Sequence, residues 1–375
     1  MKKMYVFLIL FFFASSSYSD DDIYEGLSTF TRVLDLVERN YVDDIDSREL
    51  ALNAIEGMLN SLDPYSAYLT PDRFKNLEEG TSGEFGGVGM EITIKNGVLT
   101  VVSPLEDTPA YAAGIESGDQ IVEINGKSSK KMIELEAVKL LRGPVGTEVT
   151  IKVKKKRDSS FEVIKLERSI IYIKSVKSEL LDGKLGYVKL FQFQDKTSSE
   201  LKDAIDKLQK ENNGKLSGLI LDLRNNPGGL LTQAVEVVDE FIDEGIIVSV
   251  KGRNRGQNLD YYATKNSEIH EFPIVVLVNK GSASASEVVA EALQDYNRST
   301  IIGTKTFGKG SVQTIIKLED GSGLKITTAK FYAPSGRSIN NVGVVPDVIV
   351  ENKDSKSDLQ LKRAKELIAA KNSAN

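Results

Sequence analysis

Apolar residues recur at helical spacing near both ends of the chain. An i, i+3, i+4, i+7 stripe occurs twice near the N-terminus, at Phe30, Val33, Leu34 and Val37 and again at Leu50, Ala54, Ile55, Met58 and Leu59. This spacing is typical of amphipathic helices. We therefore predict a helical segment over residues 20–82. Another amphipathic helix is predicted at 358–371, within a C-terminal tail that covers 351–375.

Short β-rich runs separated by glycines replace this pattern between residues 83 and 168. The predicted strands are 88–94, 98–102, 120–124, 148–154 and 161–166. One helix, 132–141, interrupts them. The basic run 152–157 is expected on an edge strand, where lysines prevent pairing with another chain. This part of the chain is predicted to be a separate small β-domain.

Strands and helices alternate from residue 169 to residue 350. The predicted strands are 185–191, 216–223 and 273–278, and the predicted helices are 198–210, 230–242 and 284–296. The second and third strands are almost continuously apolar, which indicates that they are buried on both faces. Alternation of this kind is typical of a sheet with helices packed on it. We predict an α/β fold for this core.

Residues 1–19 have the pattern of a secretory signal peptide. Two lysines precede the unbroken apolar run 5–13, and a short stretch of small, mostly polar residues follows. Ser17 and Ser19 occupy small-x-small positions, which favours cleavage before Asp20. The apolar run is shorter than the roughly 20 residues that a membrane-spanning helix needs. We expect an exported protein, periplasmic or extracytoplasmic in general.

The composition excludes several kinds of chemistry. The chain has 375 residues and a formal net charge of −6 at pH 7, which disfavours nucleic acid as a partner. Cysteine is absent, so thiol nucleophiles, disulfides and Cys-ligated metals are excluded. His270 is the single histidine, which excludes His-pair metal motifs. We expect no metal and no cofactor.

Two short motifs match known patterns without the context that these patterns require. The segment 303–309 resembles most of a phosphate-binding loop, but Gly310 stands where Ser or Thr would hold Mg²⁺. A predicted strand follows, so no helix N-terminus would face the phosphates. The segment 128–131 matches the S-x-x-K motif of β-lactamases but lacks its companion motifs. Neither chemistry is expected.

Two strand-to-helix turns are candidates for an acyl-transfer site. A serine-rich turn follows the strand 273–278, and a turn with adjacent glycines spans 222–229. Free backbone N–H groups in such turns can stabilise an oxyanion. Ser284 and Glu287 also match a capping box, and capping alone is the commoner role for such a serine. Two such turns in one sheet would lie close together, which favours a site.

A serine nucleophile needs a base, and the chain offers two candidates. His270 lies in a polar loop and is expected at the surface. Lys309 is flanked by Gly308 and Gly310 among predicted strands. A lysine base must be neutral near pH 7, which requires that its pKa fall by roughly three units, and burial in an apolar pocket can supply this. Lone lysines are usually solvated, and the flanking glycines and neighbouring predicted strands only weaken that alternative for Lys309.

These motifs together resemble the C-terminal processing peptidases, or tail-specific proteases, over nearly the whole chain after the leader. The spacing between serine and lysine in that family selects Ser284 and Lys309 as a catalytic dyad. Further matching blocks lie at 62–68 and 327–348. The resemblance implies that Gln313 orients the lysine and that the oxyanion hole is formed by the N–H groups of Ala285 and of Gly229 or Gly228.

The β-rich unit 83–168 resembles a PDZ domain. Its segment 86–92 is similar to the carboxylate-binding loop and edge strand of such domains, to which a peptide tail adds as a strand. The resemblance implies that the substrate-binding residues are Gly87, Val88, Gly89, Met90 and Ile92. Arg142 is a candidate for coupling peptide binding to the active site, with an ordinary surface arginine as the alternative.

The resemblances imply an exported serine endopeptidase that recognises the C-terminal tails of proteins or peptides through its PDZ domain. A crotonase-like α/β protease core at 169–350 would cleave them through an acyl-enzyme. A homodimer is expected, with the helical segment and the tail helix as assembly elements, and an adaptor protein is left open. The alternatives are a non-catalytic PDZ scaffold and acyl-CoA chemistry on the same core, against which the leader and the PDZ-like unit argue.

Overall fold

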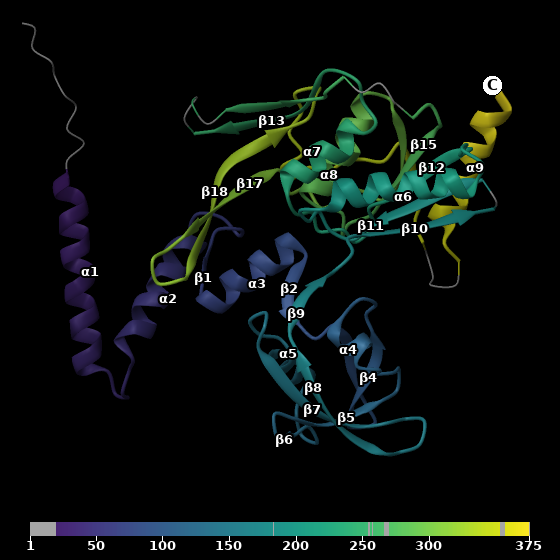
Figure 1. The fold of residues 1–375 in the computed structure, drawn as a ribbon. Helices are drawn as coiled ribbons and strands as arrows, with labels where there is room; N and C mark the ends of the chain where they lie inside the picture. The colour runs from purple at the N-terminus through teal and green to yellow at the C-terminus, as the bar shows by residue number, and fades with distance from the viewer. Residues whose placement is uncertain are drawn as a thin grey trace, which may run out of the picture.

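Three regions follow one another along the chain (Figure 1). The computed structural model describes residues 20–182, 184–253, 256, 258–265, 270–352 and 357–374. The predicted signal peptide, residues 1–19, lies outside the described residues. Within the described ranges, every helix is too short or too polar to cross a lipid bilayer.

The N-terminal region consists of helices and one short strand. Its elements are α1 (Asp20–Asn40), α2 (Ser47–Asn60), β1 (Ala67–Leu69) and α3 (Pro71–Ser82). The helical periodicity predicts the helices but not β1. α1 extends away from the rest of the molecule (Figure 1). Its apolar side chains remain exposed, namely Ile23, Leu27, Phe30, Val33, Leu36 and Val37.

The β-rich unit folds into a sheet of order β3-β4-β5-β7-β8, with β6 beside β5. The strands are β3 (Met90–Lys95), β4 (Val98–Pro104), β5 (Gln120–Ile124), β6 (Lys127–Ser128), β7 (Glu148–Lys154) and β8 (Phe161–Glu167), and the helices are α4 (Pro109–Ala112) and α5 (Glu134–Leu141). All the predicted strands are present. β3 forms one edge of the sheet and contacts α5.

The basic run 152–157 does not lie on an edge strand. β7 pairs with β5 on one side and with β8 on the other, so the edge-strand prediction is wrong. Lys155 is buried and forms a 2.5 Å ion pair with the fully buried Asp119. Its ammonium also donates to the carbonyl of Gly114 at 2.7 Å. Lys155 is therefore a structural residue of the β-domain, because removing either partner would leave an unpaired buried charge.

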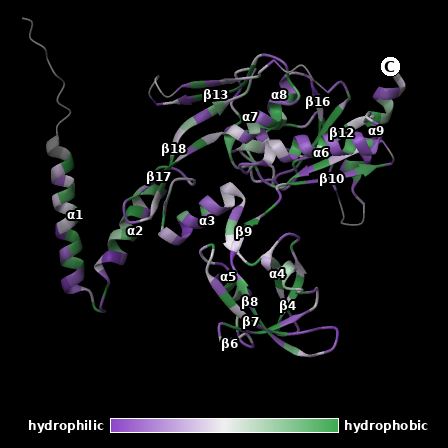
Figure 2. Cartoon of the chain, viewed as in Figure 1, coloured by the Kyte–Doolittle hydropathy of each residue, from purple (hydrophilic) through white to green (hydrophobic). Residues whose placement is uncertain are grey.

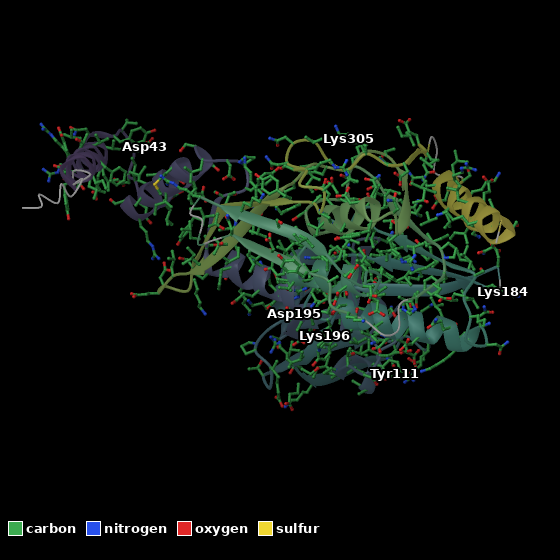
Figure 3. The ribbon with its side chains drawn as sticks, turned by 90° about the horizontal axis from the view of Figure 1, so that it is seen from above. Asp43, Tyr111, Lys184, Asp195, Lys196 and Lys305 are labelled. Carbon is green, nitrogen blue, oxygen red and sulfur yellow. The ribbon has the colours of Figure 1, made fainter. Side chains whose placement is uncertain are left out.

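A two-stranded ribbon connects the β-domain to the core. β2 (Glu84–Gly87) enters the domain and pairs antiparallel with β9 (Ser169–Tyr172), which leaves it. Lys196 of the core forms an ion pair with Glu84 at 2.9 Å and lies over the Tyr172 ring. The neighbouring Asp195, labelled in Figure 3 beside Lys196, donates its backbone N–H to the carbonyl of Thr81 at the end of α3. The ribbon, α3 and the core thus meet at one place.

The core contains a six-stranded sheet of order β10-β11-β12-β15-β16-β19, in which only β10 is antiparallel. Its strands are β10 (Val176–Leu181), β11 (Leu185–Leu190), β12 (Gly218–Asp222), β15 (Ile274–Val278), β16 (Ser299–Gly303) and β19 (Val348–Ile349). Its helices are α6 (Thr197–Glu211), α7 (Leu231–Asp239), α8 (Ala285–Asp295) and α9 (Leu359–Ala374). The predicted α/β fold class is confirmed.

Helices cover both faces of this sheet, which explains its uniformly apolar central strands. Leu219, Leu221 and Val276 pack toward α6, α7 and α8, whereas Ile220 and Val275 pack toward α9. Successive side chains of a strand point to opposite faces, so both sets must be apolar. Figure 2 shows the resulting hydrophobic strands inside the core. The predicted tail helix is therefore part of the core packing.

A second sheet joins the core to the N-terminal region. Its order is β1-β18-β13-β14, with β17 paired to β18. The strands are β13 (Ile246–Gly252), β14 (Leu259–Tyr262), β17 (Ser311–Lys317) and β18 (Gly323–Tyr332). The β17–β18 hairpin reaches from the core to α2, where β1 pairs antiparallel with β18 (Figure 1). The segment before β17, which carries Lys309, is thereby brought close to residues of the N-terminal region.

Candidate active site

The two strand-to-helix turns singled out in the sequence lie side by side. β12 and β15 are parallel neighbours, with Asp222 opposite Leu277 in the register. Their carboxyl ends therefore meet at the same edge of the sheet, where open α/β sheets place their ligands. The turn after β12 leads to α7, and the turn after β15 leads to α8, whose first residue is Ala285. The sequence-based expectation of two adjacent sets of backbone donors is met.

Asn226 connects the two turns and is absent from the sequence-based site. Its side chain is fully buried, donates to the carbonyl of Leu190 at 3.0 Å and accepts from the N–H of Gly228 at 2.9 Å. Its own carbonyl accepts from the N–H of Ala283 and the hydroxyl of Ser286. The only sequence signal for this role is a polar residue placed between a buried strand and a glycine turn.

Ser284 is the N-cap residue of α8 and has an unusual backbone conformation. Its φ of 56° and ψ of −116° are rare for a residue other than glycine, and such strain persists only where the surroundings enforce it. Its side chain makes no capping hydrogen bond. Only the Glu287 half of the capping box is used, because that carboxylate accepts the backbone N–H of Ser284 at 2.8 Å. Capping therefore does not occupy the serine hydroxyl.

The Glu287 carboxylate fixes the positions of Ser284 and Lys309. It is fully buried, and its Oε2 accepts the backbone N–H of Ser284 at 2.8 Å and that of Lys309 at 2.9 Å. Its Oε1 accepts the hydroxyl of Thr306 at 2.5 Å and the N–H of Gly308 at 2.7 Å. Because both N–H groups donate to the same oxygen, the backbone nitrogens of Ser284 and Lys309 lie close together. In the sequence, Glu287 is recognisable only as part of a helix cap.

The same contacts explain why the segment 303–309 is not a phosphate-binding loop. The hydroxyl of Thr306 and the N–H groups of Gly308 and Lys309 all donate to Glu287. β17 follows this segment instead of a helix. The donors that would hold a phosphate are thus already used by a carboxylate of the chain itself.

The Lys309 side chain is half-buried, and its ammonium lies 5.0 Å from the centre of the Tyr65 ring. Burial lowers the pKa of Lys309 from its ordinary 10.5, because the charged form loses hydration. The positive charge of Lys325 acts in the same direction, whereas the charges of Asp63 and Glu287 oppose it. The net effect favours the neutral amine that a base requires.

The structure brings the backbones of Ser284 and Lys309 together, but their side chains are not hydrogen-bonded to each other in the described part of the chain. The Gln313 side chain does not bond to Lys309 either: its NH₂ group donates to the hydroxyls of Ser311 at 2.8 Å and Thr327 at 3.3 Å, and its carbonyl oxygen accepts from no other described residue. The lysine amine instead lies over the Tyr65 ring.

The block 62–68 places an aromatic ring against the lysine. Asp63 accepts the N–H groups of Tyr65 and Ser66 and the hydroxyl of Ser66. Desolvation alone would raise the pKa of Asp63, but these hydrogen bonds together outweigh it and hold the pKa below its ordinary value. Ser66 in turn accepts the N–H of Thr327 on β18 at 3.1 Å. The tight turn thus positions the Tyr65 ring beside Lys309, which the sequence alone did not reveal.

Two N–H groups beside Ser284 remain available. The N–H groups of Gly229 and Ala285 donate to no other described residue, whereas that of Gly228 is used by Asn226. A Cβ atom on Gly228 would lie 2.8 Å from Cβ of Ser284, and Gly228 has a φ of +99°. Only glycine permits this close approach of the two turns.

His270 is not the surface residue that its polar loop suggests. Its side chain is only 11% exposed, stacks on Phe272 and lies 3.2 Å from the Glu240 carboxylate. It has no contact with Ser284 in the described structure. The described residues also contain no group of three His, Cys, Asp or Glu side chains arranged to hold a metal ion.

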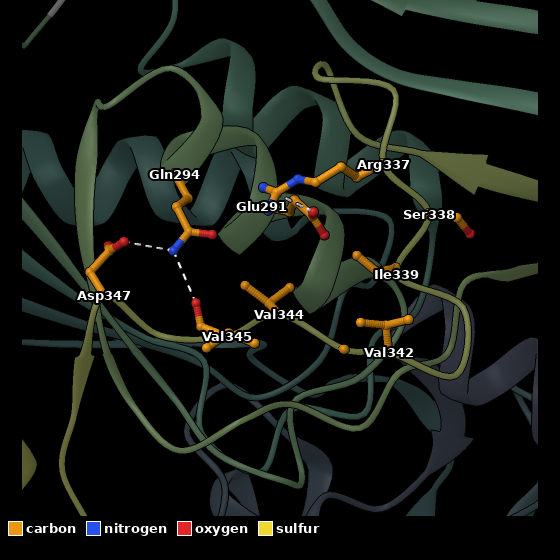
Figure 4. A pocket seen from close by; sticks show the side chains of 10 residues that line it. Glu291, Gln294, Arg337, Ser338, Ile339, Val342, Val344, Val345 and Asp347 are labelled. Carbon is orange, nitrogen blue, oxygen red and sulfur yellow. Dashed lines mark hydrogen bonds and ion pairs between the residues drawn. The ribbon is translucent and has the colours of Figure 1, made fainter.

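A cavity of about 370 Å³ adjoins α8 one turn beyond Glu287 (Figure 4). Glu291 lines it with 5% exposure, and its Oε2 has no hydrogen-bond partner among the described residues. Burial raises the pKa of Glu291 to about 7, although Arg337, 3.3 Å away, opposes this and the charges of Asp295 and Glu287 add to it. Near neutral pH the Glu291 carboxyl group is therefore partly protonated.

We expect stability to fall as the pH rises through this range. Between the ordinary pKa of 4.5 and the folded value of about 7, the folded state holds a proton that the unfolded state has lost. The shift corresponds to about 3 kcal/mol of unfolding free energy. Urea unfolding of Glu291→Gln should show a flatter pH dependence than the parent chain, and Glu211→Gln, which changes an exposed carboxylate, should not. If the unfolding free energies of Glu291→Gln and of the parent changed with pH in the same way, this prediction would be wrong.

The β-domain has a groove of about 220 Å³ between β3 and α5. The predicted residues Gly87, Val88, Gly89, Met90 and Ile92 all line it, together with Phe85, Glu91, Glu134, Val138, Leu141 and Arg142. The carbonyls of Val88 and Gly89 accept hydrogen bonds from α4 and from Leu105, whereas their N–H groups donate to no other described residue. The open edge of β3 and these free N–H groups are suited to a peptide carboxylate.

Arg142 connects this groove to the N-terminal region. Its guanidinium lies 4.0 Å from the centre of the Phe85 ring and forms a 3.1 Å ion pair with Glu79 of α3. The following Gly143 donates to the carbonyl of Gly86 at 3.1 Å. Arg142 is therefore not an isolated surface residue.

Family models match three parts of the chain. They are "Peptidase family S41" over residues 184–350, "PDZ domain" over residues 100–155 and "Activating protease CtpB N-terminal domain" over residues 13–72. Each match falls in one of the three regions of the structure: the peptidase model in the core, the PDZ model in the β-domain and the third model in the N-terminal region. They favour a peptidase over a non-catalytic scaffold or an acyl-CoA enzyme.

Whole-chain relatives agree with these matches. A carboxy-terminal-processing protease of Bartonella bacilliformis is 46% identical over 334 residues, which are 89% of this chain and 77% of the relative. A probable CtpA-like serine protease of Staphylococcus aureus is 42% identical, and the match covers 87% of this chain but 65% of that protein. The solved photosystem II D1 C-terminal processing protease is 33% identical with a TM-score of 0.50, over 90% of this chain and 96% of its own. The chain therefore belongs to peptidase family S41 and is a serine-type, C-terminal processing peptidase with a PDZ domain.

Proposed function

We propose that Ser284 is the nucleophile and Lys309 its general base. Neutral Lys309 takes the hydroxyl proton of Ser284 as Oγ attacks the scissile carbonyl carbon. The C–N bond then breaks, Lys309 returns the proton to the leaving amine, and water hydrolyses the acyl-enzyme ester. The main support is the Glu287 carboxylate, which accepts the backbone N–H groups of both residues.

The dyad requires one side-chain movement. Lys309 leaves the Tyr65 ring and turns toward Ser284, where the side-chain carbonyl oxygen of Gln313, which accepts from no other described residue, can accept a lysine N–H. The N–H groups of Ala285 and Gly229 stabilise the oxyanion, because the N–H of Gly228 already has an acceptor. All these groups are hydrogen-bond donors or acceptors of the protein, so the mechanism needs no metal or cofactor.

The PDZ domain is proposed to bind the free C-terminus of the substrate. The N–H groups of Val88 and Gly89 would hold the terminal carboxylate, and the tail would add to the open edge of β3. Arg142 would couple tail binding to the core through its ion pair with Glu79, because α3, which carries Glu79, also contacts the core near Asp195.

A comparison of two substrates tests this function. A peptide that ends in a free carboxylate and the same peptide with a C-terminal amide are incubated with the full chain, and the products are identified by mass spectrometry. We expect the free acid to be cleaved about tenfold faster at low concentration, because charge-assisted hydrogen bonds to the carboxylate are lost in the amide. Equal rates would contradict recognition of the tail by the PDZ domain.

Export to the periplasm, or to an extracytoplasmic space in general, is proposed from residues 1–19 alone. The lysines and the apolar run of this segment support a cleaved signal peptide. The mass of the intact mature protein, determined by mass spectrometry, tests this. Cleavage of the signal peptide predicts a chain that begins at Asp20.

A homodimer is proposed from the exposed apolar side of α1. Leu27, Phe30 and Val33 are each between 44% and 56% exposed on a helix that extends into solvent. Exposed apolar surface of this extent usually marks an interaction site. A second copy of the chain is the proposed partner, and an adaptor protein is left open. Sedimentation at micromolar concentration would distinguish a dimer from a monomer.

A further inference from the structure

Two carboxylates line the peptide groove without a cationic partner. Glu91 lies on β3 and Glu134 in the first turn of α5, and both belong to the groove lining. Neither forms an ion pair with any other residue that the structure describes. Arg142, the cation of this lining, is already paired with Glu79 and covers the Phe85 ring. The groove therefore combines an apolar floor with unneutralised negative charge.

The position of the carboxylate-binding loop, residues 86–89, gives the direction of a bound tail. The loop comes directly before β3, so a tail whose carboxylate is held there runs antiparallel to β3 along its open edge. The hydrogen bond from Gly143 to Gly86 places the C-terminal end of α5 at the loop. Glu134, at the other end of α5, therefore faces residues upstream of the tail's end.

Helix and strand dimensions identify which tail residue Glu134 meets. From Val138 to Glu134 the axis of α5 advances about 6 Å, at 1.5 Å per residue. Two residues of an extended peptide span nearly the same length, about 6.6 Å. Side chains alternate along a strand, so the residue two positions before the last shares the groove-facing side with it. If the last side chain packs against Val88 and Val138, the side chain two positions earlier reaches Glu134.

We propose that the PDZ groove selects tails with an apolar last residue and a lysine or arginine two positions before it. Glu134 forms the ion pair with this basic residue, and Glu91 adds negative potential from β3. Met90, Ile92 and Leu141 supply the apolar surface for the last side chain. This inference rests on the proposed recognition of substrate tails and adds the chemistry of the preferred tail.

The test measures binding of fluorescent tails to the full chain carrying Ser284→Ala, so that no tail is cleaved. Three peptides differ only in the third-last residue, which is Lys, Ala or Glu. We expect the Lys tail to bind two- to fivefold tighter than the Ala tail, roughly the value of one exposed ion pair, and the Glu tail to bind most weakly. The preference should shrink at high salt because the charges are screened.

Substitutions of the groove residue and of a matched control complete the test. Glu134→Lys should reverse the order, so that the Glu tail binds best. Glu148→Lys, which changes an exposed glutamate at the start of β7, should leave the order unchanged. An order that Glu134→Lys does not alter would contradict the role of Glu134 while leaving tail recognition intact. Equal binding of acid and C-terminal amide tails, or no binding at all, would instead contradict the proposed tail recognition.

Discussion

Replacing Ser284 with alanine is expected to lower the rate of tail cleavage by about five to six orders of magnitude, and Lys309→Ala should do nearly the same. Members of a nucleophile–base pair act as one unit, so loss of either removes most of the catalysis. Cleavage of a quenched-fluorescence tail peptide measures the rate. A fluorophosphonate probe should label the parent chain at Ser284 and leave both variants unlabelled.

The pH dependence separates a base from a merely structural lysine. A lysine base acts only when neutral, so kcat/KM should rise with pH through the lysine pKa, which burial holds below 10.5. Lys309→Arg should be inactive at every pH, because a guanidinium stays protonated. Lys305→Ala changes an exposed lysine at the periphery of the core (Figure 3) and should retain parental activity. A pH profile that stays flat would contradict a lysine base.

Glu287→Gln is expected to lower kcat by about a hundredfold or more while KM changes little. All four groups bonded to Glu287 are donors, namely the N–H groups of Ser284, Gly308 and Lys309 and the hydroxyl of Thr306. A glutamine presents an NH₂ group to two of these donors, so two hydrogen bonds are lost. Small displacements of a nucleophile or a base cost about this much in rate.

The pH profile of the same variant tests whether Glu287 also acts through charge. Its negative charge raises the pKa of Lys309, so its removal should move the rise of kcat/KM to lower pH. A loss of folding alone would not move the profile. Glu291→Gln, one helical turn away and bonded to neither residue, should leave kcat and the profile in place. A parental profile and rate for Glu287→Gln would show that the carboxylate does not position the dyad.

Much of the fold could be predicted because periodicity is local information. The apolar runs of β12 and β15 and the alternation of β7 and β8 are visible in the sequence. The sheet formed by β1, β13 and β18 is harder to predict from the sequence, because these strands pair with partners far along the chain. The misplaced edge at 152–157 has the same origin, since a run of lysines does not reveal that β7 has neighbours on both sides.

The sequence by itself determined the α/β core and the β-domain, because their periodicity is local, and its resemblance to the C-terminal processing peptidases pointed to Ser284 and Lys309. Only the tertiary structure decided what surrounds them. Glu287 accepts N–H groups from two separate segments, Tyr65 comes from the N-terminal region, and Asn226 joins two turns. Such contacts depend on which strands pair and in which register, and pairing is a property of the whole folded chain.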